Sequence, residues 1–506
     1  MAALAIAEIL RHIFRYCDQS DNYRNSLVSK KWSGETLGAL WYHLDSLSPL
    51  LSLLAPLVDQ EDWTHTFGRP LWSHDWAIFQ EYSWRVHTIS FGRTLYSPSV
   101  FTDIALSRPQ GDLIPNLESL VCQSYDISGL LPLFLNERLA RLTVHSSGRE
   151  LHKVKPLLSY LPDRCPVLRY LDLQIHEVNP EEIGFETLLS SLSRLAELHI
   201  APALLTPCIV HALASLPSLE SLVSTNRWPI PEQKEPLRPL VDIRQWFPSL
   251  TTLELSGSFA YLISFLEAYK PNSLRRLTLD PDAQETREQH HALFQAVSSC
   301  CPKIQTLHLV NWEIWEEREP PSEMPPATWN SFEPLLTLSD LTDLAIIDLP
   351  ITTSTLIYLA ENIPSLRRIA LRRSSTVDGS PAFPIDILPQ LSKTRPELEY
   401  LCLCVDTSPS LSTVTVQENE RFQHLRTLDV GPSPLVSETL DIAVYLNGIL
   451  PEECQIIWHW DPYCNDREYV WEGWERVDYI LSSFVRDRKA AREATATGPN
   501  LNLSIS

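Results

Sequence analysis

The sequence predicts an α/β solenoid of stacked strand–helix units, preceded by a small module of three short helices. Three observations predict this fold. A leucine motif recurs along most of the chain, prolines precede many of its copies, and a different apolar pattern occupies the N-terminus. With 506 residues, the chain exceeds one ordinary compact core, so it needs either several domains or one elongated array.

Composition and charge narrow the class of protein. Hydrophobic residues make up 44% and charged residues 21% of the chain, so it can bury a core and is not wholly disordered. Its 41 Lys and Arg against 63 Asp and Glu give a net charge of -22, which has the wrong sign for broad binding to nucleic acid or to an anionic membrane. The N-terminus has no basic stretch before its apolar residues, so we expect no export signal and a cytoplasmic or nuclear location.

The N-terminal helical module is expected over residues 1–46. Apolar residues from Ile6 to Phe14 recur at the spacing of an amphipathic helix. A second short helix is expected through Leu27 and Val28, and a third from Ser33. Helices this short form a very small core, so we expect the module to complete that core against a partner. The alternative is a helical cap, because a solenoid needs the apolar edge of its first repeat covered.

Residues 47–83 are expected to form a helical linker that also caps the array. The tryptophans of this region recur at partly helical spacing, and we expect them to pack against the first strand of the array. They are Trp63, Trp72, Trp76 and Trp84.

The array itself is expected over residues 84–453. Its motif is L-x-x-L-x-L, and copies such as CPVLRYLDL at Cys165 and FPSLTTLEL at Phe247 have a proline two residues before the first apolar position. Thirteen copies recur between residues 86 and 425 about every 28 residues, within the period of roughly 20–29 residues of leucine-rich repeats. Their first apolar positions are Val86, Leu117, Leu139, Leu168, Leu195, Leu219, Leu250, Leu274, Ile304, Leu341, Leu366, Leu398 and Leu425.

Each copy predicts a strand, and a helical pattern precedes most copies. The last two apolar positions of the motif alternate, so in an extended segment both side chains point to one side. Proline ends the preceding helix because it has no N–H. Such a unit buries its leucine face only against a neighbour, which gives a solenoid with parallel strands on its concave face and helices on its convex face. A compact α/β domain with leucine-rich strands is the alternative.

Other segments interrupt or follow the array. Two proline-rich stretches, residues 228–239 and 316–326, are expected as surface loops. A cap of one strand and one helix is expected over residues 454–488. The composition then turns to Ala, Thr, Gly, Asn and Ser, which predicts a disordered tail over residues 489–506.

Alternation along the strands predicts which side chains face the concave surface. Arg368, Arg372 and Tyr400 occupy such positions, and arginine and aromatic residues are common anchors of protein interfaces. We therefore predict that these three residues contribute to binding a target protein. Further outward positions are Arg141, Tyr170, Asp172, Glu197, His199, Glu254, Arg276, Asp280 and Asp429.

The sequence contains no recognisable catalytic or metal-binding motif. It has no glycine-rich phosphate loop, nucleophile elbow or HExxH pair. Its ten cysteines are scattered without a CxxC pair, so we expect buried free thiols, and we expect a structural role for His290 and His291. We therefore expect no cofactor, no metal and no enzymatic activity. An enzyme or sensor with a site in the concave surface is a further alternative.

Two family resemblances follow from these motifs. From about residue 84 to residue 453, the chain resembles the leucine-rich repeat family in its irregular form. The N-terminus resembles the F-box motif, with IAEILRHIF from Ile6 as its helical start, VSKKW from Val28 as its V-x-[RK]-x-W centre, and Leu40-Trp41 as its end. The family's usual Leu-Pro start is absent, and Ala7 stands about where its proline would be.

The resemblance implies a non-catalytic substrate-recognition subunit of a cullin-type (SCF) ubiquitin ligase. The F-box helices would dock on a Skp-family adaptor, and through it on a cullin, while the repeats would bind a target protein. The alternative is a leucine-rich repeat scaffold without a ligase role, whose N-terminal helices only cap the solenoid. The implied adaptor contacts and their supporting core are Ile6, Ile9, Ile13, Phe14, Leu27, Val28, Trp32, Leu40 and Trp41.

Overall fold

The computed structural model divides the chain into two compact units. The first comprises Met1–Asn226 with Arg238–Thr252, and the second comprises Arg227–Leu237 with Leu253–Ser506. Both proline-rich stretches and the C-terminal tail lie outside the residues that the structure describes. The described residues are 7–60, 64–91, 96–122, 128–147, 151–176, 185–224, 246–281, 287–310, 329–347, 349, 351–372, 383–408, 420–431, 433, 435–458 and 473–486.

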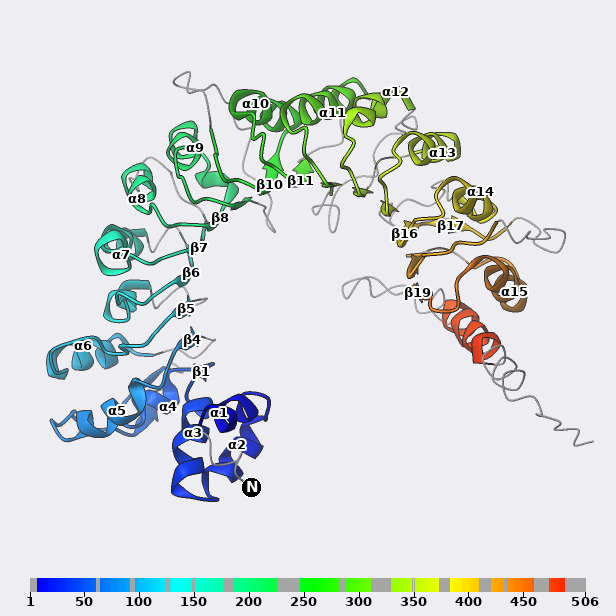
Figure 1. Ribbon diagram of the computed structural model, residues 1–506. Coiled ribbons are helices and arrows are strands. Elements are labelled where there is room, and N and C mark those ends of the chain that lie inside the picture. The colour runs from blue at the N-terminus through cyan, green and yellow to red at the C-terminus, as the bar shows by residue number, and fades with distance from the viewer. Residues whose placement is uncertain are drawn as a thin grey trace, which may run out of the picture. The chain divides into compact units, whose positions relative to one another are not determined.

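The first unit contains a parallel sheet with helices between its strands. Its strands lie in the order β1-β4-β5-β6-β7-β8-β9, and Figure 1 shows the helices of the repeats together on one side of them. The sheet strands are β1 (His43–Leu44), β4 (Thr88–Phe91), β5 (Ser119–Cys122), β6 (Arg141–Ser147), β7 (Tyr170–His176), β8 (Glu197–Ile200) and β9 (Ser221–Ser224). The helices are α1 (Ala7–Phe14), α2 (Gln19–Ser26), α3 (Lys30–Leu40), α4 (Ser48–Leu51), α5 (Asp75–Ser83), α6 (Pro98–Ser107), η2 (Ser128–Leu133), α7 (Leu151–Arg164), α8 (Phe185–Ser191), η5 (Pro202–Leu204) and α9 (Pro207–Ala214).

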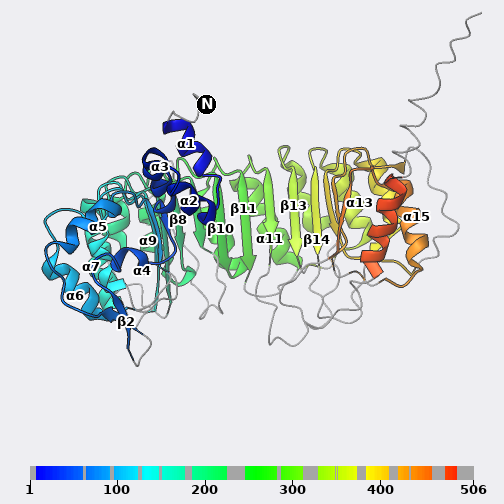
Figure 2. The same cartoon turned by 90° about the horizontal axis from the view of Figure 1, so that it is seen from below.

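The second unit repeats this arrangement. Its strands lie in the order β10-β11-β12-β13-β14-β16-β18-β19, and Figure 2 shows β10 to β14 side by side. These strands are β10 (Thr252–Gly257), β11 (Arg276–Pro281), β12 (Thr306–Leu309), β13 (Asp343–Ile347), β14 (Arg368–Arg372), β16 (Tyr400–Leu403), β18 (Thr427–Asp429) and β19 (Gln455–Ile457). A short parallel pair joins β15 (Phe383–Pro384) and β17 (Val405–Asp406). The helices are α10 (Phe259–Tyr269), α11 (Arg287–Cys300), α12 (Trp329–Phe332), η6 (Glu333–Thr337), α13 (Thr353–Asn362), α14 (Ile387–Thr394), α15 (Thr439–Ile449) and a last helix over residues 473–486.

Buried leucines hold the repeats together. All thirteen first apolar positions of the motif are at most 1% exposed, and each of the thirteen strands from β4 to β18 that continue the main sheets begins two residues later. The next apolar positions, such as Leu171 and Leu173 of β7, are fully buried as well. Each buried leucine side chain contributes about 1.5–3 kcal/mol relative to exposure. One strand per copy of the motif is therefore confirmed.

A recurring turn explains the position of the prolines. The N–H of the first apolar residue donates to the carbonyl three residues earlier, as from Leu168 to Cys165 (3.1 Å) and from Leu366 to Ile363 (3.3 Å). The motif's proline is the second residue of this four-residue turn, a position for which its fixed φ is suited. The proline thus shapes the turn that leads from helix to strand, besides limiting the helix before it.

Three details of the N-terminal region differ from the sequence-based expectations. The sheet begins at β1, which pairs with β4 (His43 with Thr88) well before residue 84. The third helix begins at Lys30 rather than Ser33, because the Ser29 side chain caps it by accepting from the Trp32 N–H. Residues 47–83 are not only helical, since they contain an antiparallel pair of strands, β2 (Leu57–Asp59) and β3 (His65–Phe67).

A buried carboxylate at the start of α5 forms hydrogen bonds with the residues that precede this helix. Asp75 is 3% exposed and accepts two hydrogen bonds from the Arg69 guanidinium, at 2.7 and 2.8 Å. The Trp72 N–H donates to the same carboxylate (2.8 Å), and Arg69 also donates to the Leu54 carbonyl (3.1 Å). The hydrogen bond from Arg69 is the main cause that lowers the pKa of Asp75 to about 2.

We expect this pair to make the stability of the first unit depend on pH in the acid range. The folded pKa of Asp75 lies below its ordinary value of 3.8, so the stabilisation is present above that value and is lost as the pH falls toward 2. The wild type should melt at a higher temperature than Asp75→Asn at about pH 6, should lose about half of that advantage by about pH 3, and should lose most of it by about pH 2. Scanning calorimetry of both proteins checks this, and a difference in Tm that stays constant over the range would contradict it.

Candidate functional site

The three N-terminal helices pack around very few side chains. Leu10 and Phe14 of α1 are buried, and the Phe14 ring meets Trp32 of α3 edge-on, with 5.4 Å between the ring centroids. Thr36 of α3 is also buried, and its hydroxyl donates to the Trp32 carbonyl. A core of this size leaves the module only marginally stable by itself.

Polar contacts fix the connections between these helices. The Asn22 side-chain amide of α2 donates to the carbonyls of Phe14 (2.8 Å) and Cys17 (3.3 Å), and the Phe14 carbonyl at the end of α1 also accepts from the Cys17 N–H (3.3 Å). Asp18 caps α2 by accepting from the Asp21 N–H at 2.7 Å. The polar residues after α1 therefore fix the angle between α1 and α2.

Four of the nine predicted adaptor-contact residues are exposed. The exposed fractions are 38% for Ile9, 40% for Ile13, 72% for Leu27 and 61% for Val28. Leu27 is the C-cap of α2 and Val28 precedes the N-cap of α3, so both lie in the connection between helices and not within a helix as expected. Exposed apolar side chains close together in sequence are typical of a surface that a partner covers.

The other five predicted adaptor-contact residues lie in different parts of the structure. Phe14 and Trp32 belong to the small core of the module. Leu40 lines a cavity described below, and Trp41 packs against Tyr82 of α5 with 4.8 Å between ring centroids. Ile6 lies outside the described residues.

Stacked charged and aromatic side chains line the strands of the first unit. The Arg141 guanidinium lies 3.9 Å from the centroid of the Tyr170 ring, its register partner on the next strand. The Tyr170 ring also contacts His199 (5.2 Å between centroids), and His199 pairs with Glu197 at 3.0 Å. Arg141, Tyr170 and Glu197 occupy equivalent strand positions, and together with His199 they form a row across the sheet.

The second unit has a corresponding row that contains two of the three predicted target-binding residues. The Arg368 guanidinium lies 4.5 Å from the centroid of the Tyr400 ring, again its register partner, and its Nε is 3.2 Å from Asp343. The Tyr400 hydroxyl donates to Asp429 at 3.1 Å. Arg368 and Tyr400 are therefore brought together. Arg372 ends β14, and its side chain lies outside the described part of the structure.

Two residues predicted to face outward are instead buried. Asp280 is 4% exposed and accepts from the Ser256 hydroxyl at 2.9 Å. Asp429 is 3% exposed and accepts from the Gly431 N–H at 2.9 Å as well as from Tyr400. Alternation places them on the outward positions, but neighbouring donors enclose both carboxylates and offset the cost of burial. Neither offers a free charge to a partner.

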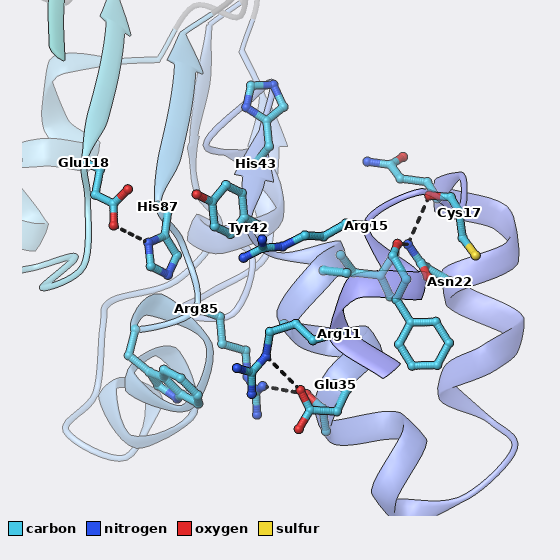
Figure 3. Close-up of a pocket in the computed structure, with 17 residues that line it drawn as sticks. Arg11, Arg15, Cys17, Asn22, Glu35, Tyr42, His43, Arg85, His87 and Glu118 are labelled. Atoms are coloured by element: carbon cyan, nitrogen blue, oxygen red, sulfur yellow. Dashed lines mark hydrogen bonds and ion pairs between the residues drawn. The ribbon is translucent and has the colours of Figure 1, made fainter. Parts of the chain in front are cut away.

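A cavity of about 890 Å³ lies in the first unit, between the N-terminal helices and the start of the sheet (Figure 3). Arg11 pairs with Glu35 at 3.0 Å, and His87 pairs with Glu118 at 3.0 Å. The Arg85 guanidinium lies 4.5 Å from the centroid of the Trp84 ring. The lining residues are Arg11, Phe14, Arg15, Cys17, Gln19, Asn22, Gly34, Glu35, Gly38, Ala39, Leu40, Tyr42, His43, Trp84, Arg85, His87 and Glu118.

Sequence reasoning missed this cavity. Its walls combine α1 and α3 with residues 84–87 and Glu118, which are far apart along the chain. The one available indication was the spacing of Arg11 and Arg15, which puts both on one side of a helix.

Within the described residues, no group of three or more His, Cys, Asp or Glu side chains is placed to hold a metal ion. The described histidines near the start of α11 have structural contacts, since His290 packs edge-on against Phe259 and His291 bonds to the Asn330 carbonyl. Burial raises the pKa of the Cys165 thiol to about 12, which keeps it protonated and unreactive. No helix in the described part is long and apolar enough to cross a bilayer.

The strands, helices and rows above define a mixed α/β protein of stacked strand–helix repeats. No protein-family model and no curated protein matches the chain. Among solved structures, the leucine-rich repeat-containing protein LegL7 from Legionella pneumophila is similar, with a TM-score of 0.33 and 11% identity over 78% of this chain and 97% of that chain. A structure of the Rad7 and Elc1 complex in yeast is also similar, with a TM-score of 0.33 and 14% identity over 74% of this chain and 91% of that chain.

Proposed function

We propose that this chain is the substrate-recognition subunit of a cullin-type (SCF) ubiquitin ligase. The N-terminal helices dock on a Skp-family adaptor, which links the chain to a cullin, and the repeats bind a target protein. The chain carries out no bond chemistry itself and acts in the cytoplasm or the nucleus. The F-box resemblance of residues 6–41 is the origin of this proposal.

The observation that best supports this proposal is the exposure of Leu27 and Val28. Val28 begins the segment that resembles the F-box centre and Leu27 directly precedes it. Leu27 is 72% and Val28 is 61% exposed, in a module whose own core is very small. Burying either side chain against a partner would contribute about 1.5–3 kcal/mol. Ile9 and Ile13 add further exposed apolar surface on α1. A docking partner for this module accounts for both the exposed side chains and the small core.

We expect Leu27→Asp to weaken capture of a Skp-family adaptor about thirtyfold, the effect of losing a central interface contact of about 2 kcal/mol. The measurement is co-purification of the adaptor with the tagged full-length chain from cells. Leu106→Asp is the matched control, because Leu106 of α6 is 83% exposed and lies outside the module. Equal capture by both variants and the wild type would argue against the proposed docking surface.

The target-binding role rests on the row in the second unit. Arg368 is half-exposed, stacks on Tyr400 and is held by Asp343, so its guanidinium is already ordered before a target binds. Reversal of the charge at Arg368 together with Arg372 should reduce target capture by at least about tenfold, the usual loss for a charged hydrogen bond. Crosslinking of bound proteins in cells, followed by mass spectrometry, measures this. Unchanged capture by the double variant would remove these residues from the target site.

A leucine-rich repeat scaffold without a ligase role is the second candidate. The packing of Trp41 on Tyr82 favours it, because this contact attaches the N-terminal helices to the repeats, as a cap requires. The scaffold predicts that no adaptor co-purifies with the wild-type chain. It also predicts that Leu27→Asp leaves the set of bound proteins unchanged.

A further inference from the structure

The cavity beside the N-terminal helices has a charge opposite to that of the chain. The chain carries a net charge of -22, yet the charged side chains that line the cavity are three arginines and two glutamates. With its histidines neutral, the lining has one positive charge in excess. An isolated positive site on an acidic protein favours an anionic ligand.

The three guanidinium groups are only partly neutralised. Arg11 pairs with Glu35, whereas Arg85 forms no ion pair with a carboxylate of the described residues (Figure 3). Arg85 donates to the Gly34 carbonyl at 3.1 Å, but its Nε is buried without a hydrogen-bond acceptor in the described structure. Among the described residues, Arg15 has an aromatic neighbour, Tyr42, at 5.8 Å and no carboxylate within ion-pair distance. The exposed Arg15 guanidinium is therefore open to an entering carboxylate, whereas the unpaired Nε of Arg85 is itself buried.

Aromatic surface lies next to these cations. Trp84 is 48% exposed and Tyr42 is 38% exposed, and both line the cavity. The Tyr42 ring stacks on His87 with 4.6 Å between centroids, which holds it in place. An apolar side chain placed beside a bound carboxylate would cover these rings. The volume of about 890 Å³ admits a few residues of a peptide.

On helix α1, the residues that line the cavity lie on a different side from the proposed adaptor contacts. Successive residues of a helix are rotated by about 100°, so Arg11 and Arg15 lie about 200° around the axis from Ile9 and Ile13. The buried stripe of Leu10 and Phe14 lies between them. The basic stripe lines the cavity and the apolar stripe is exposed, so the two surfaces can be occupied at the same time.

We propose that this cavity binds a short peptide segment of a partner protein in which one acidic side chain stands next to an apolar one. The carboxylate binds between Arg15 and Arg85, and the apolar side chain packs on Trp84 and Tyr42. The excess of a single positive charge matches one carboxylate. A polyphosphate fits poorly, because Glu35 and Glu118 would repel its further charges. This site is independent of adaptor docking.

The test is selection from a library of random displayed peptides on the folded full-length chain. We expect the enriched peptides to share Asp or Glu beside Phe, Trp, Tyr or Leu. Arg15→Glu should weaken binding of an enriched peptide at least about tenfold, since it removes one charge-assisted hydrogen bond and adds repulsion. Arg15 is exposed, so this variant should fold normally.

Two matched control variants show whether the loss of peptide binding is specific to the cavity. Arg24→Glu changes the same residue type on α2, where Arg24 is 76% exposed, and should leave peptide binding unchanged. Leu27→Asp should also leave it unchanged, which separates this site from the proposed adaptor surface. Enrichment of peptides without an acid, no enrichment at all, equal binding by Arg15→Glu, or displacement of the peptide by equimolar inorganic phosphate would each overturn the proposal.

Discussion

Phe14→Ala is expected to unfold the N-terminal helices while the parallel strands of the first unit stay folded. Phe14 is 2% exposed and packs on Trp32, so its truncation should cost about 3–5 kcal/mol. A core as small as this one rarely supplies more than that amount. The strands from β5 onward depend on their own leucine ladder and not on Phe14, so they should remain protected.

Hydrogen exchange followed by mass spectrometry distinguishes these regions. Peptides covering α1 to α3 should lose their protection in Phe14→Ala, whereas peptides covering β6 to β8 should exchange as in the wild type. Tyr23→Ala is the control, because Tyr23 of α2 is 62% exposed and its truncation should leave both regions unchanged. Retained protection of α1 to α3 in Phe14→Ala would mean that the repeats, and not this core, hold the module together.

Trp474→Ala should open the C-terminal end of the second unit. Trp474 is fully buried, and its indole N–H donates to the Ser433 carbonyl at 2.9 Å. The Ser433 hydroxyl accepts from the Val405 N–H at 2.7 Å, so the tryptophan is connected to β17. Added bulk at Gly473 would come within 3.0 Å of Leu435, which indicates how closely the helix over residues 473–486 is seated.

Loss of this side chain should cost about 3–5 kcal/mol at that end of the array. The expected result is faster hydrogen exchange in α15, β18 and β19, since repeats pass destabilisation mainly to their neighbours. Trp329→Ala is the matched control, because Trp329 is 48% exposed and contacts only the Tyr358 ring among its described aromatic neighbours. Trp474→Phe should have a smaller effect of about 1 kcal/mol, the value of the lost hydrogen bond. Unchanged exchange in Trp474→Ala would show that the last helix does not stabilise the sheet.

The repeats could be predicted from the sequence because one physical requirement recurs. Each unit must bury its first apolar residue, and the positions from Val86 to Leu425 are all buried and all precede a strand. The proline at a fixed offset reflects the turn that most units form before their strand. A packing requirement that recurs in each unit produces a periodic pattern in the sequence, and such a pattern can be recognised without the structure.

Features that depend on contacts between distant segments could not be predicted in this way. The strands β2 and β3 form a single antiparallel pair without any repeat to reveal them. The burial of Asp280 depends on Ser256 from the preceding strand, and alternation alone places it outside. The cavity gathers Arg15, Arg85 and Glu118 from three separate elements. The exposure of Leu27 follows from the exact end of α2, which a sequence pattern fixes only to within a few residues.

Direct binding between the purified full-length chain and a purified Skp-family adaptor tests the central claim. Light scattering after size-exclusion chromatography should show a complex of one chain with one adaptor for the wild type and for Leu106→Asp. Under the same conditions, Leu27→Asp should elute separately from the adaptor. A folded wild-type chain that forms no complex with the adaptor, even at micromolar concentration, would contradict the account and favour the scaffold.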